Sequence, residues 1–204
     1  MAEFARPLRE EDADSDPIRQ FRLWFEDAAS VGVRAPEAAA VATASADGAP
    51  SVRMVLVKQV DEDGFVFYSN HASRKGRELD ANPRAALLFY WDAIGRQVRI
   101  EGGVRRMSAA ESAPYIRSRA RGSQLSALAS PQSRVVESRA WLEQRVAELT
   151  ARCGDDEPPL PNGWGGFVIA PRAIEFWQHR EDRLHDRLLY TCADSGWRIE
   201  RLAP

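Results

Sequence analysis

Four short stretches of this chain carry clusters of arginine, lysine and hydroxyl side chains, the groups that bind phosphate oxygens in proteins. They are Arg53–Lys58 (RMVLVK), Ser73–Lys75 (SRK), Tyr115–Ser123 (YIRSRARGS) and Arg183–Arg187 (RLHDR), the last of which follows Trp177. Because the net charge of the whole chain is −2 and its pI is near 6.0, the positive charge is local and fits a small anion better than a nucleic acid. The clusters are therefore candidates for binding a small anion such as a phosphate.

The first two clusters can each be explained without a ligand. Arg53 and Lys58 are five residues apart, so they project to opposite faces of a regular strand, as the charged ends of a core strand also would. Arg74 and Lys75 lie in the first turn of a predicted helix, where the macrodipole disfavours positive charge unless an anion is bound. A bound phosphate and a solvated basic turn are both consistent with this second pattern.

The other two clusters are equally open when each is taken alone. The third places hydroxyl and guanidinium groups around a predicted helix end, which suits a phosphate monoester but also describes an exposed arginine-rich loop. In the fourth, Arg183, His185 and Arg187 alternate along a predicted extended segment and would share one face. Such a face is also typical of the polar side of a sheet.

The sequence lacks the motifs of several other enzyme classes. It contains neither G-x-G-x-x-G after a strand nor a P-loop, which disfavours a Rossmann dinucleotide site and a nucleotide triphosphatase. It has no G-x-S-x-G elbow, and His71, His179 and His185 have no carboxylate partner in a hydrolase pattern. Cys153 and Cys192 lack metal-ligand spacing and are expected to be free thiols, so no metal site is predicted.

Alternating apolar and β-branched residues predict many short strands joined by tight turns. Asp47-Gly48 is a hairpin signal, and a second turn is expected from Asp61 to Gly64. Gly102-Gly103 interrupts its strand and suggests a bulge. The strands are predicted at about 38–46, 51–60, 65–69, 84–91, 96–107, 167–170, 173–177, 187–191 and 197–202.

Helices are predicted from capping residues and from apolar spacing near 3.6 residues. Asp16 and Ser73 are expected to cap the first two helices, and Ser108 with Glu111 forms a capping box for a short third one. A longer helix is expected at about 133–152. Its buried stripe is predicted at Val135, Leu142, Val146 and Leu149.

Consecutive strands with inserted helices indicate a mainly β fold, an antiparallel barrel with appended helices, and argue against a doubly wound parallel sheet. One domain is expected over 16–204, after a polar leader at 1–15, with the turn-rich stretch 154–166 as a surface connection. No apolar stretch approaches the length of a membrane span, and the leader has neither a signal nor a transit-peptide pattern. We therefore expect a soluble, cytoplasmic protein.

Taken in order along the chain, eleven motifs resemble those of the pyridoxine 5′-phosphate oxidase family. They are RMVLVK, FYSN, SRKGREL, NPRAALLFYW, RQVRIEG, YIRSRARGSQ, SPQS, WGGF, EFWQ, RLHDR and RLAP. The resemblance covers Glu37 to Pro204, and its collinear order is far more specific than any single motif. It implies an antiparallel split β-barrel that binds FMN in a cleft at the interface of a homodimer.

The resemblance also implies which residues bind the cofactor and the substrate. The positions that match the family's FMN site are Arg53, Met54, Val55, Leu56, Val57, Lys58, Tyr68, Ser69, Arg74, Lys75, Gln97, Gln132, Ser133, Trp177 and Arg187. Those that match its substrate site are Lys58, Tyr115, Arg119, Ser123, Arg183 and His185. The last two are implied to lie over the pyridine ring and are the catalytic candidates.

The implied reaction oxidises pyridoxamine or pyridoxine 5′-phosphate at C4′ to pyridoxal 5′-phosphate. Two electrons pass from C4′ to flavin N5, after which the imine of the amine substrate is hydrolysed, whereas the alcohol gives the aldehyde directly. Oxygen then reoxidises the flavin and yields hydrogen peroxide. Because the cofactor carries the hard step, the lack of a nucleophile or a triad is consistent with this reaction.

One segment departs from the family pattern. Members of the vitamin pathway carry an Arg-Arg-Glu-Tyr-like segment that folds over the substrate, whereas this chain has FARPLREEDADSD before its first predicted helix. Two alternatives therefore stay open: an FMN oxidase of another reduced ring, such as a dihydrophenazine precursor, and a non-catalytic flavin- or pyridoxal-phosphate-binding protein. Tyr115, Arg119 and Ser123 argue against the first alternative, because a phosphate-free substrate would not need them.

Overall fold

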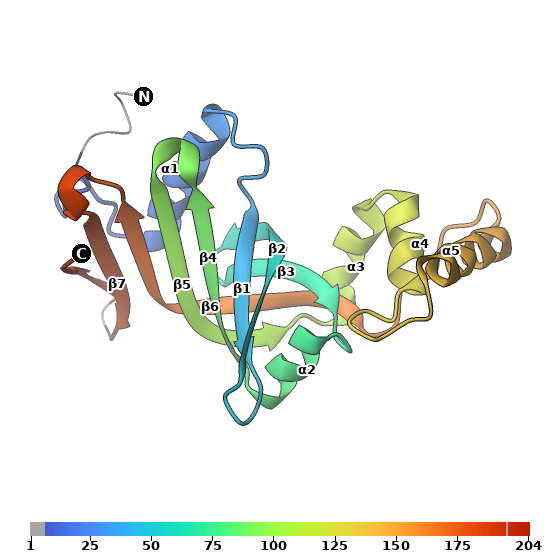
Figure 1. Cartoon of the computed structure of the whole chain (residues 1–204). Helices are drawn as coiled ribbons and strands as arrows, with labels where there is room; N and C mark the ends of the chain where they lie inside the picture. Colours follow the sequence, from blue (N-terminus) through green and yellow to red (C-terminus); the bar gives the residue numbers. More distant parts are fainter. Residues whose placement is uncertain (1–6, 195) are drawn as a thin grey trace.

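The computed structural model describes residues 7–194 and 196–204. Within these ranges the chain is mainly β, as predicted (Figure 1). The strands are β1 (Ala38–Ala44), β2 (Pro50–Asp61), β3 (Gly64–Asn70), β4 (Arg84–Trp91), β5 (Arg96–Arg106), β6 (Trp164–Gln178), β7 (Asp186–Ala193) and β8 (Gly196–Arg201). The α-helices are α1 (Pro17–Ser30), α2 (Arg74–Ala81), α3 (Ala109–Ser118), α4 (Arg121–Ala129) and α5 (Arg139–Cys153).

Strands β1 to β6 close into an antiparallel barrel. Their order is β3-β2-β1-β4-β5-β6, and β3 pairs with β6 to complete the ring. Strands β7 and β8 continue the sheet from β6 and stand outside the barrel, at the left of Figure 1. The predicted antiparallel barrel with appended helices is therefore confirmed, and closure leaves its own strands without free edges.

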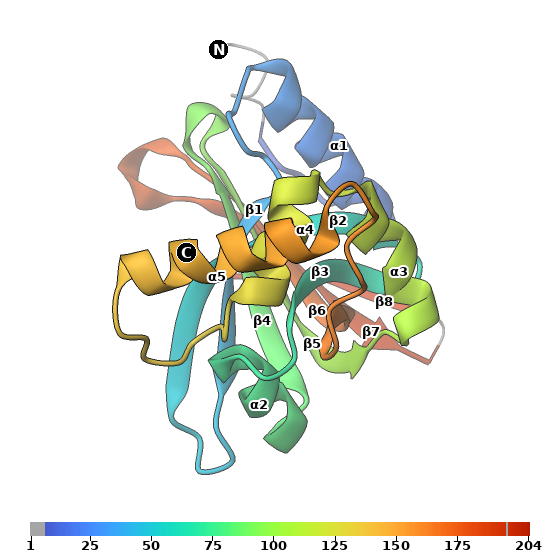
Figure 2. The same ribbon diagram turned by 90° about the vertical axis from the view of Figure 1, so that its right-hand side faces the viewer.

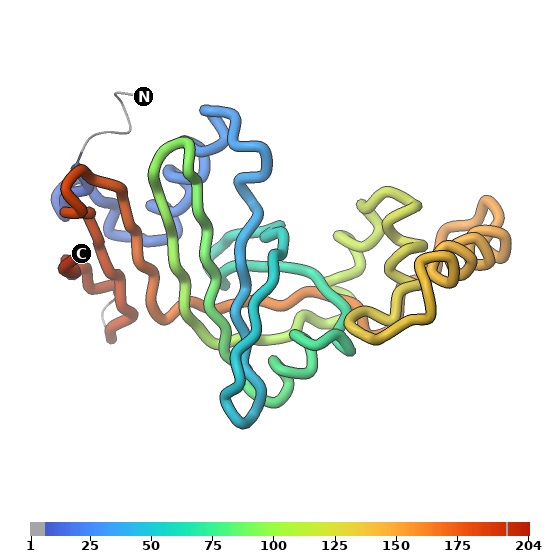
Figure 3. The backbone as a smooth tube through the Cα atoms, viewed as in Figure 1, coloured from blue at the N-terminus to red at the C-terminus, as the bar shows by residue number. Residues whose placement is uncertain are grey.

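Strand β6 belongs to both the barrel and its extension, and the tube in Figure 3 shows it running from one to the other. One edge of β6 pairs with β3 as far as Ile169 and with β7 from Ala173 onward. Pro171, which has no backbone N–H, lies between these two ladders. No backbone hydrogen bond is therefore lost on that edge of β6. The prediction of two separate strands here was wrong, whereas the predicted bulge is confirmed between Glu101 and Gly102.

Helix α1 packs an aromatic face against the barrel interior. Asp16 caps it, as predicted, because Asp16 Oδ1 accepts a hydrogen bond from Ile18 N at 2.9 Å. The buried Phe21 ring lies 4.9 Å from the Phe65 ring on β3 and 5.0 Å from the Phe89 ring on β4. Aromatic pairs of this kind add about 0.5–1.5 kcal/mol each to the apolar area that they bury. These contacts fix α1 against two strands of the barrel.

Helices α3, α4 and α5 lie together beyond one end of the barrel, and Figure 2 views the molecule from that side. The prediction of a helix at 133–152 was wrong at its start, because Ser138 caps α5 by accepting from Trp141 N at 3.1 Å. The predicted buried stripe was also wrong: no residue of α5 is buried, and Val135 is fully exposed. Helix α4 was not predicted, since RGSQLSALA has no strong apolar face.

The other helix starts follow the local capping rules. Ser73 Oγ accepts from Gly76 N at 3.3 Å, and Ser108 with Glu111 forms the predicted capping box at α3.

Cys153 and Cys192 are free thiols. Over the described ranges, the helices are all too short or too polar to cross a membrane.

Candidate active site

A basic pocket lies where β2, α2 and the loop after α4 meet. It is lined by Ser51, Val52, Arg53, Met54, Arg74, Lys75, Arg77, Gln132 and Ser133. The pairing of β2 turns Arg53 to the same face as buried Val57, and Lys58 projects to the opposite face, as their spacing predicts. The structure thus brings together the side chains that sequence reasoning had selected as phosphate ligands, from segments up to 80 residues apart.

Lys75 is the buried cation of the basic pocket. Its Nζ donates to Ser69 Oγ at 2.9 Å, and Ser69 Oγ donates to Gln132 Oε1 at 3.1 Å. Burial, followed by the nearby charge of Arg53, lowers the pKa of Lys75. Because a buried ammonium group is costly unless it is paired, an anion in this pocket would stabilise it.

The loop that closes the basic pocket is held in an unusual backbone conformation. Ser133 has a φ of 69°, in the left-handed region that residues other than glycine rarely adopt. Its neighbour Gln132 is fixed because Gln132 Oε1 also accepts from Asn70 N at 3.2 Å. Conformations of this kind cost of order 1 kcal/mol and gather at functional sites, where surrounding contacts maintain them.

A buried carboxylate, Glu78, stands behind the basic pocket and was missed by sequence reasoning. Glu78 Oε1 accepts from Arg74 Nε at 2.8 Å, and Glu78 Oε2 lies 3.3 Å from Arg53 Nη2. Burial alone would raise the pKa of Glu78, but hydrogen bonds from Ser51, Thr43 and Arg74 outweigh it and lower that pKa to about 2. The carboxylate is therefore ionised at neutral pH and links both arginines.

A second hollow, the serine-rich pocket, adjoins the first. It is lined by Tyr68, Ser69, Asn70, Arg119, Ser123, Ser126, Ala127, Ser130, Gln132 and Trp164. The Arg119 guanidinium lies 4.7 Å from the centre of the Trp164 ring, and Tyr68 stacks on Tyr115 with ring centres 3.9 Å apart. Within the described part of the chain, Arg119 Nη1 is buried and has no hydrogen-bond partner. An unpaired buried donor is costly, so this geometry favours an acceptor ligand.

The three arginines of the third sequence cluster have different surroundings. Arg117 Nη1 donates to Pro158 O at 2.7 Å, and Arg121 donates to Asp156 O and to Gly154 O, each at 2.6 Å. These two arginines hold the loop between α5 and β6. Arg119 is the member of the cluster that lines the serine-rich pocket.

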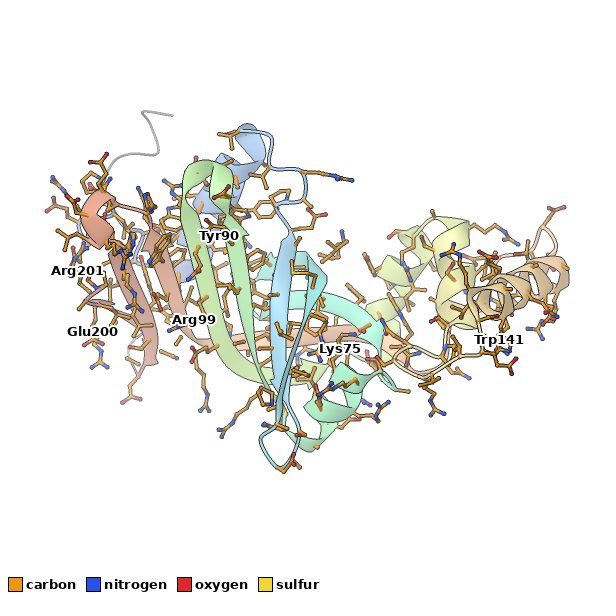
Figure 4. All side chains as sticks on the ribbon, in the orientation of Figure 1. Lys75, Tyr90, Arg99, Trp141, Glu200 and Arg201 are labelled. Carbon is orange, nitrogen blue, oxygen red and sulfur yellow. The ribbon has the colours of Figure 1, made fainter. Side chains whose placement is uncertain are left out.

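A third group of predicted residues forms a row across the outer face of β5, β6 and β7. Gln97 pairs with Trp177, and Trp177 pairs with Arg187. Strands β1 and β4 lie between β5 and β2 on one side of the barrel. On the other side, β3 pairs with β6 only from Trp164 to Ile169, away from Trp177. In Figure 4, Lys75 on α2 lies apart from Arg201, which marks the β7–β8 end of the sheet. One chain therefore does not bring all the predicted cofactor residues together.

The loop from β6 to β7, residues 179–185, presents the catalytic candidates beside this row. Its hollow is lined by Trp177, His179, Arg180, Glu181, Asp182, Arg183 and His185. The prediction of an extended segment was wrong at Arg183, because Asp182 and Arg183 have φ values of 55° and 62° and sit in a short 3₁₀ turn, Glu181–Arg183. A left-handed turn is not visible in residue alternation. His185 Nδ1 accepts from Arg180 N at 3.1 Å, which leaves the proton of the neutral ring on Nε2.

Two residues predicted for the cofactor site, Lys58 and Val57, line neither the basic nor the serine-rich pocket. Lys58 Nζ pairs with Glu37 Oε1 at 3.3 Å. Val57 is 5% exposed and packs in the barrel core, so only its backbone can reach a ligand. In contrast, Met54 and Leu56 are 64% and 46% exposed on the outer face of β2.

Comparison with known proteins identifies the family. The profile described as pyridoxamine 5′-phosphate oxidase matches residues 25–153, and the profile of the pyridoxine 5′-phosphate oxidase C-terminal dimerisation region matches residues 164–204. The chain belongs to the pyridoxamine 5′-phosphate oxidase family. It is 55% identical over 197 residues to a pyridoxine/pyridoxamine 5′-phosphate oxidase of Rubrobacter xylanophilus, which covers 97% of this chain and 91% of that relative. The resemblance seen in the sequence is confirmed.

Other known proteins are similar over nearly the whole chain. A pyridoxine/pyridoxamine 5′-phosphate oxidase of Salinibacter ruber is 52% identical over 206 residues, covering 99% of this chain and 96% of its own. The crystal structure of PhzG from Burkholderia lata, in complex with tetrahydrophenazine-1-carboxylic acid, matches with a TM-score of 0.90 at 34% identity and covers 97% and 98% of the two chains. A related FMN-binding protein of Nostoc punctiforme has a TM-score of 0.74 at 17% identity over 92% and 98%, which shows the shared fold.

This member of the family also contains a second buried glutamate that sequence reasoning missed. Glu175 on β6 is 2% exposed and pairs with Arg187 and Arg99 at 2.7 and 2.8 Å. Only Glu78 had a local signal, its i,i+4 spacing from Arg74. The partners of Glu175 lie on neighbouring strands, so only the strand register brings the three charges together.

Proposed function

We propose that this chain is an FMN-dependent oxidase that converts pyridoxamine 5′-phosphate or pyridoxine 5′-phosphate to pyridoxal 5′-phosphate. Oxygen is the electron acceptor and is reduced to hydrogen peroxide. With the amine substrate, water hydrolyses the imine and ammonia is released, whereas the alcohol gives the aldehyde directly. The observation that carries the proposal is that the basic pocket and the serine-rich pocket adjoin each other. Both are lined by Gln132, whose Oε1 accepts from Ser69 Oγ. A phosphorylated cofactor beside a phosphorylated substrate requires two such pockets.

The basic pocket fits the phosphate of FMN. Arg53, Arg74 and Lys75 line it, and the backbone amides at the start of α2 add the positive end of a helix dipole. Ser133 can donate a further hydrogen bond from the pocket rim. Bound FMN would supply the two-electron acceptor that this chain's own side chains do not provide.

The serine-rich pocket fits the phosphate of the substrate. Arg119 already stacks on Trp164 and keeps one buried N–H group without a partner in the described chain. Ser123 offers a hydroxyl in the same pocket, and Tyr115 is held beside it by stacking on Tyr68. These groups would anchor the substrate at a distance from its reacting carbon, so they act through binding and orientation.

The loop at 179–185 would position the substrate ring. Because His185 Nδ1 is occupied by the backbone N–H of Arg180, His185 can present an N–H donor at Nε2. Arg183 projects from a left-handed turn into the same hollow. Together these side chains can hold the oxygen or nitrogen substituents of a pyridine ring in one orientation.

The arrangement of the site supports a homodimer. Gln97, Trp177 and Arg187 lie apart from the basic pocket, so a second copy of the chain would have to bring its row to that pocket. The outer face of β2 exposes Val52 and Met54 at 69% and 64%, and such apolar exposure is typical of a surface that becomes buried on association. The expected solution species is twice the chain mass of 22.8 kDa, and flavin-loaded protein that sediments as a monomer would contradict this assembly.

A second candidate function is favoured by one specific observation, the TM-score of 0.90 to PhzG in complex with a tetrahydrophenazine carboxylic acid. A reduced carboxylated ring could use the same flavin site. The serine-rich pocket favours the phosphorylated substrate, because Arg119 with Ser123 matches a phosphate monoester and would be largely unused by a substrate without one. A non-catalytic flavin- or pyridoxal-phosphate-binding protein is the third candidate.

The test is an oxygen-consumption assay on protein reconstituted with FMN. Its substrates are pyridoxine 5′-phosphate, pyridoxamine 5′-phosphate, unphosphorylated pyridoxine and a reduced phenazine, under identical conditions. We expect turnover and hydrogen peroxide release with the two phosphates and far poorer turnover of pyridoxine. Turnover of the phenazine alone would replace the vitamin assignment, and a yellow protein that oxidises none of the four substrates would support the non-catalytic candidate.

A further inference from the structure

Glu78 is the one acidic side chain in contact with the arginines of the basic pocket among the described residues, and it has no place in the proposed reaction. It lies on α2, and its side chain is 8% exposed. A carboxylate beside an anion site weakens the binding of anions through charge repulsion unless it has another effect. Its contacts indicate what that effect is.

Each oxygen of Glu78 holds a different arginine. Oε1 accepts from Arg74 Nε at 2.8 Å, which leaves the two terminal nitrogens of Arg74 for a ligand. Oε2 accepts from the hydroxyls of Thr43 and Ser51, both at 2.5 Å, and lies 3.3 Å from Arg53 Nη2. One carboxylate therefore connects α2 with β1 and β2.

The two hydroxyls form a second layer between Glu78 and Arg53. Arg53 Nη1 donates to Thr43 Oγ1 at 2.5 Å, and Arg53 Nη2 donates to Ser51 Oγ. Because each hydroxyl accepts from the arginine and donates to the carboxylate, the directions of these four hydrogen bonds are fixed. Three contacts of the Arg53 guanidinium therefore lead to Glu78. Arg53 Nη1 also donates to the backbone oxygens of Val41 and Ser51, at 3.4 and 3.3 Å.

We propose that Glu78 is a positioning residue that orients Arg53 and Arg74 toward a phosphate monoester and thereby selects FMN over unphosphorylated flavin. This inference rests on the proposed FMN site. Long arginine side chains lose considerable conformational entropy when a ligand orders them. By ordering two of them in advance, Glu78 would raise affinity for the phosphate despite its own negative charge.

The proposal makes a prediction that is opposite in sign to a simple charge effect. In a Glu78→Gln variant the amide NH₂ must face either Arg74 or Arg53, so at least one donor loses its acceptor. If only net charge mattered, removing the carboxylate would tighten FMN binding. If Glu78 positions the arginines, FMN binding weakens while riboflavin, which has no phosphate, binds as it does to the wild-type protein.

The experiment measures FMN and riboflavin affinities of full-length apoprotein by quenching of flavin fluorescence. We expect wild-type protein to prefer FMN and the Glu78→Gln variant to lose about tenfold or more of that preference. Glu143→Gln is the matched control: Arg139 Nε and Glu143 Oε1 are 2.7 Å apart at the same i,i+4 spacing, but the pair is exposed on α5. The Glu143→Gln variant should keep the wild-type ratio of FMN affinity to riboflavin affinity.

A second variant keeps the test decisive if Glu78→Gln does not fold. Glu78→Asp retains the charge but shortens the side chain, so it cannot reach both arginines, and we expect its FMN preference to fall as well. If the soluble Glu78 variants keep or increase the ratio of FMN affinity to riboflavin affinity, Glu78 does not position the arginines. Wild-type protein that binds FMN and riboflavin equally would instead contradict the proposed phosphate site, which separates the two failures.

Discussion

Arg187 Nε donates to Glu175 Oε1 at 2.7 Å and joins β7 to β6 on the face that carries Gln97 and Trp177. The same buried carboxylate pairs with Arg99 Nη2 at 2.8 Å. The bond to Glu175 raises the pKa of Arg187 above its ordinary value, so this arginine stays charged at every accessible pH. Two guanidinium groups on this face thus share one buried carboxylate, and Arg99 Nε also lies 3.1 Å from Glu101 Oε1.

Replacing that carboxylate should destabilise the fold. Glu175→Gln leaves Arg99 and Arg187 without their common anion, and we expect a loss of about 2–3 kcal/mol in the free energy of unfolding. Chemical denaturation followed by tryptophan fluorescence measures this loss. The exposed pair on α5 provides the control, since Glu143→Gln should change stability by no more than about 0.5 kcal/mol. Similar losses for both variants would show that burial of Glu175 is unimportant.

The strands and helix caps could be predicted from the sequence because their signals are local. Residue alternation, the Asp47-Gly48 turn and the caps at Asp16 and Ser73 each act within a few residues, and all of them appear in the structure. The long helix was placed too early because apolar spacing at Val135 resembled a buried stripe. In the structure that residue is fully exposed and precedes the cap of α5.

The site could be predicted only in part, because its geometry depends on contacts between distant segments. Arg53, Arg74 and Lys75 of the basic pocket were selected from the sequence, whereas Arg77 was not. The i,i+4 spacing of Glu78 from Arg74 was a local signal, but its contacts with Thr43 and Ser51, 35 and 27 residues away, could not be predicted. The turn at Arg183 depends on positive φ values that no alternation pattern encodes. The distribution of predicted cofactor residues over separate faces also became visible only with the strand order.

The first turn of α2 should control retention of FMN. In the double variant Arg74→Ala with Lys75→Ala, two charge-assisted bonds of about 1.5–3 kcal/mol each are lost, which implies binding weakened by tens- to thousands-fold before allowance for non-additivity. Flavin content after dialysis, read from the visible spectrum, measures the effect. Arg139→Ala, an exposed arginine at the start of α5, is the control. Full flavin content in the double variant would show that the basic pocket is not part of the cofactor site.

Arg119 should act as a substrate phosphate anchor, whereas its neighbour Arg117 should not. Arg119→Ala is expected to raise KM for pyridoxine 5′-phosphate much more than it lowers kcat, because a contact remote from C4′ contributes mainly uniform binding. Arg117→Ala loses the bond to Pro158 O and should lower the thermal stability with little change in KM. Steady-state kinetics on both variants tests this division. Equal KM values for Arg119→Ala and the wild-type protein would refute it.

Arg183 should behave differently from Arg119 because it belongs to the loop that faces the substrate ring. Arg183→Ala should depress kcat as well as raise KM, since ring orientation affects the reacting geometry itself. The same assay with pyridoxine 5′-phosphate measures both constants. Identical kinetic profiles for Arg183→Ala and Arg119→Ala would mean that anchoring and ring positioning are not separate roles.

The polar leader is attached to the end of the chain through Arg201. Arg201 Nη2 donates to Leu8 O at 2.7 Å, and Arg201 Nη1 donates to Asp186 Oδ1 at 2.9 Å. Leu8 N in turn donates to Asp186 Oδ2 at 3.1 Å. Arg201 Nε donates to Glu10 Oε1 at 2.8 Å, and hydrogen bonding to Arg201 is the main cause that lowers the pKa of Glu10 to about 2. Of the segment FARPLREEDADSD, residues 4–6 lie outside the described chain.

Attachment of the leader should therefore weaken in acid. Because the pKa of Glu10 is lower in the folded protein than its ordinary 4.5, the pair contributes stability above about pH 4.5 that is lost as the pH falls toward 2. The pair is half exposed, so the effect should be small and reduced by salt. We expect Glu10→Gln to accelerate amide hydrogen exchange at residues 8–10 near neutral pH and to remove its acid dependence, while exchange in β4 stays unchanged. Equal exchange at residues 8–10 in wild-type and variant protein would show that Asp186 holds the leader without help from Glu10.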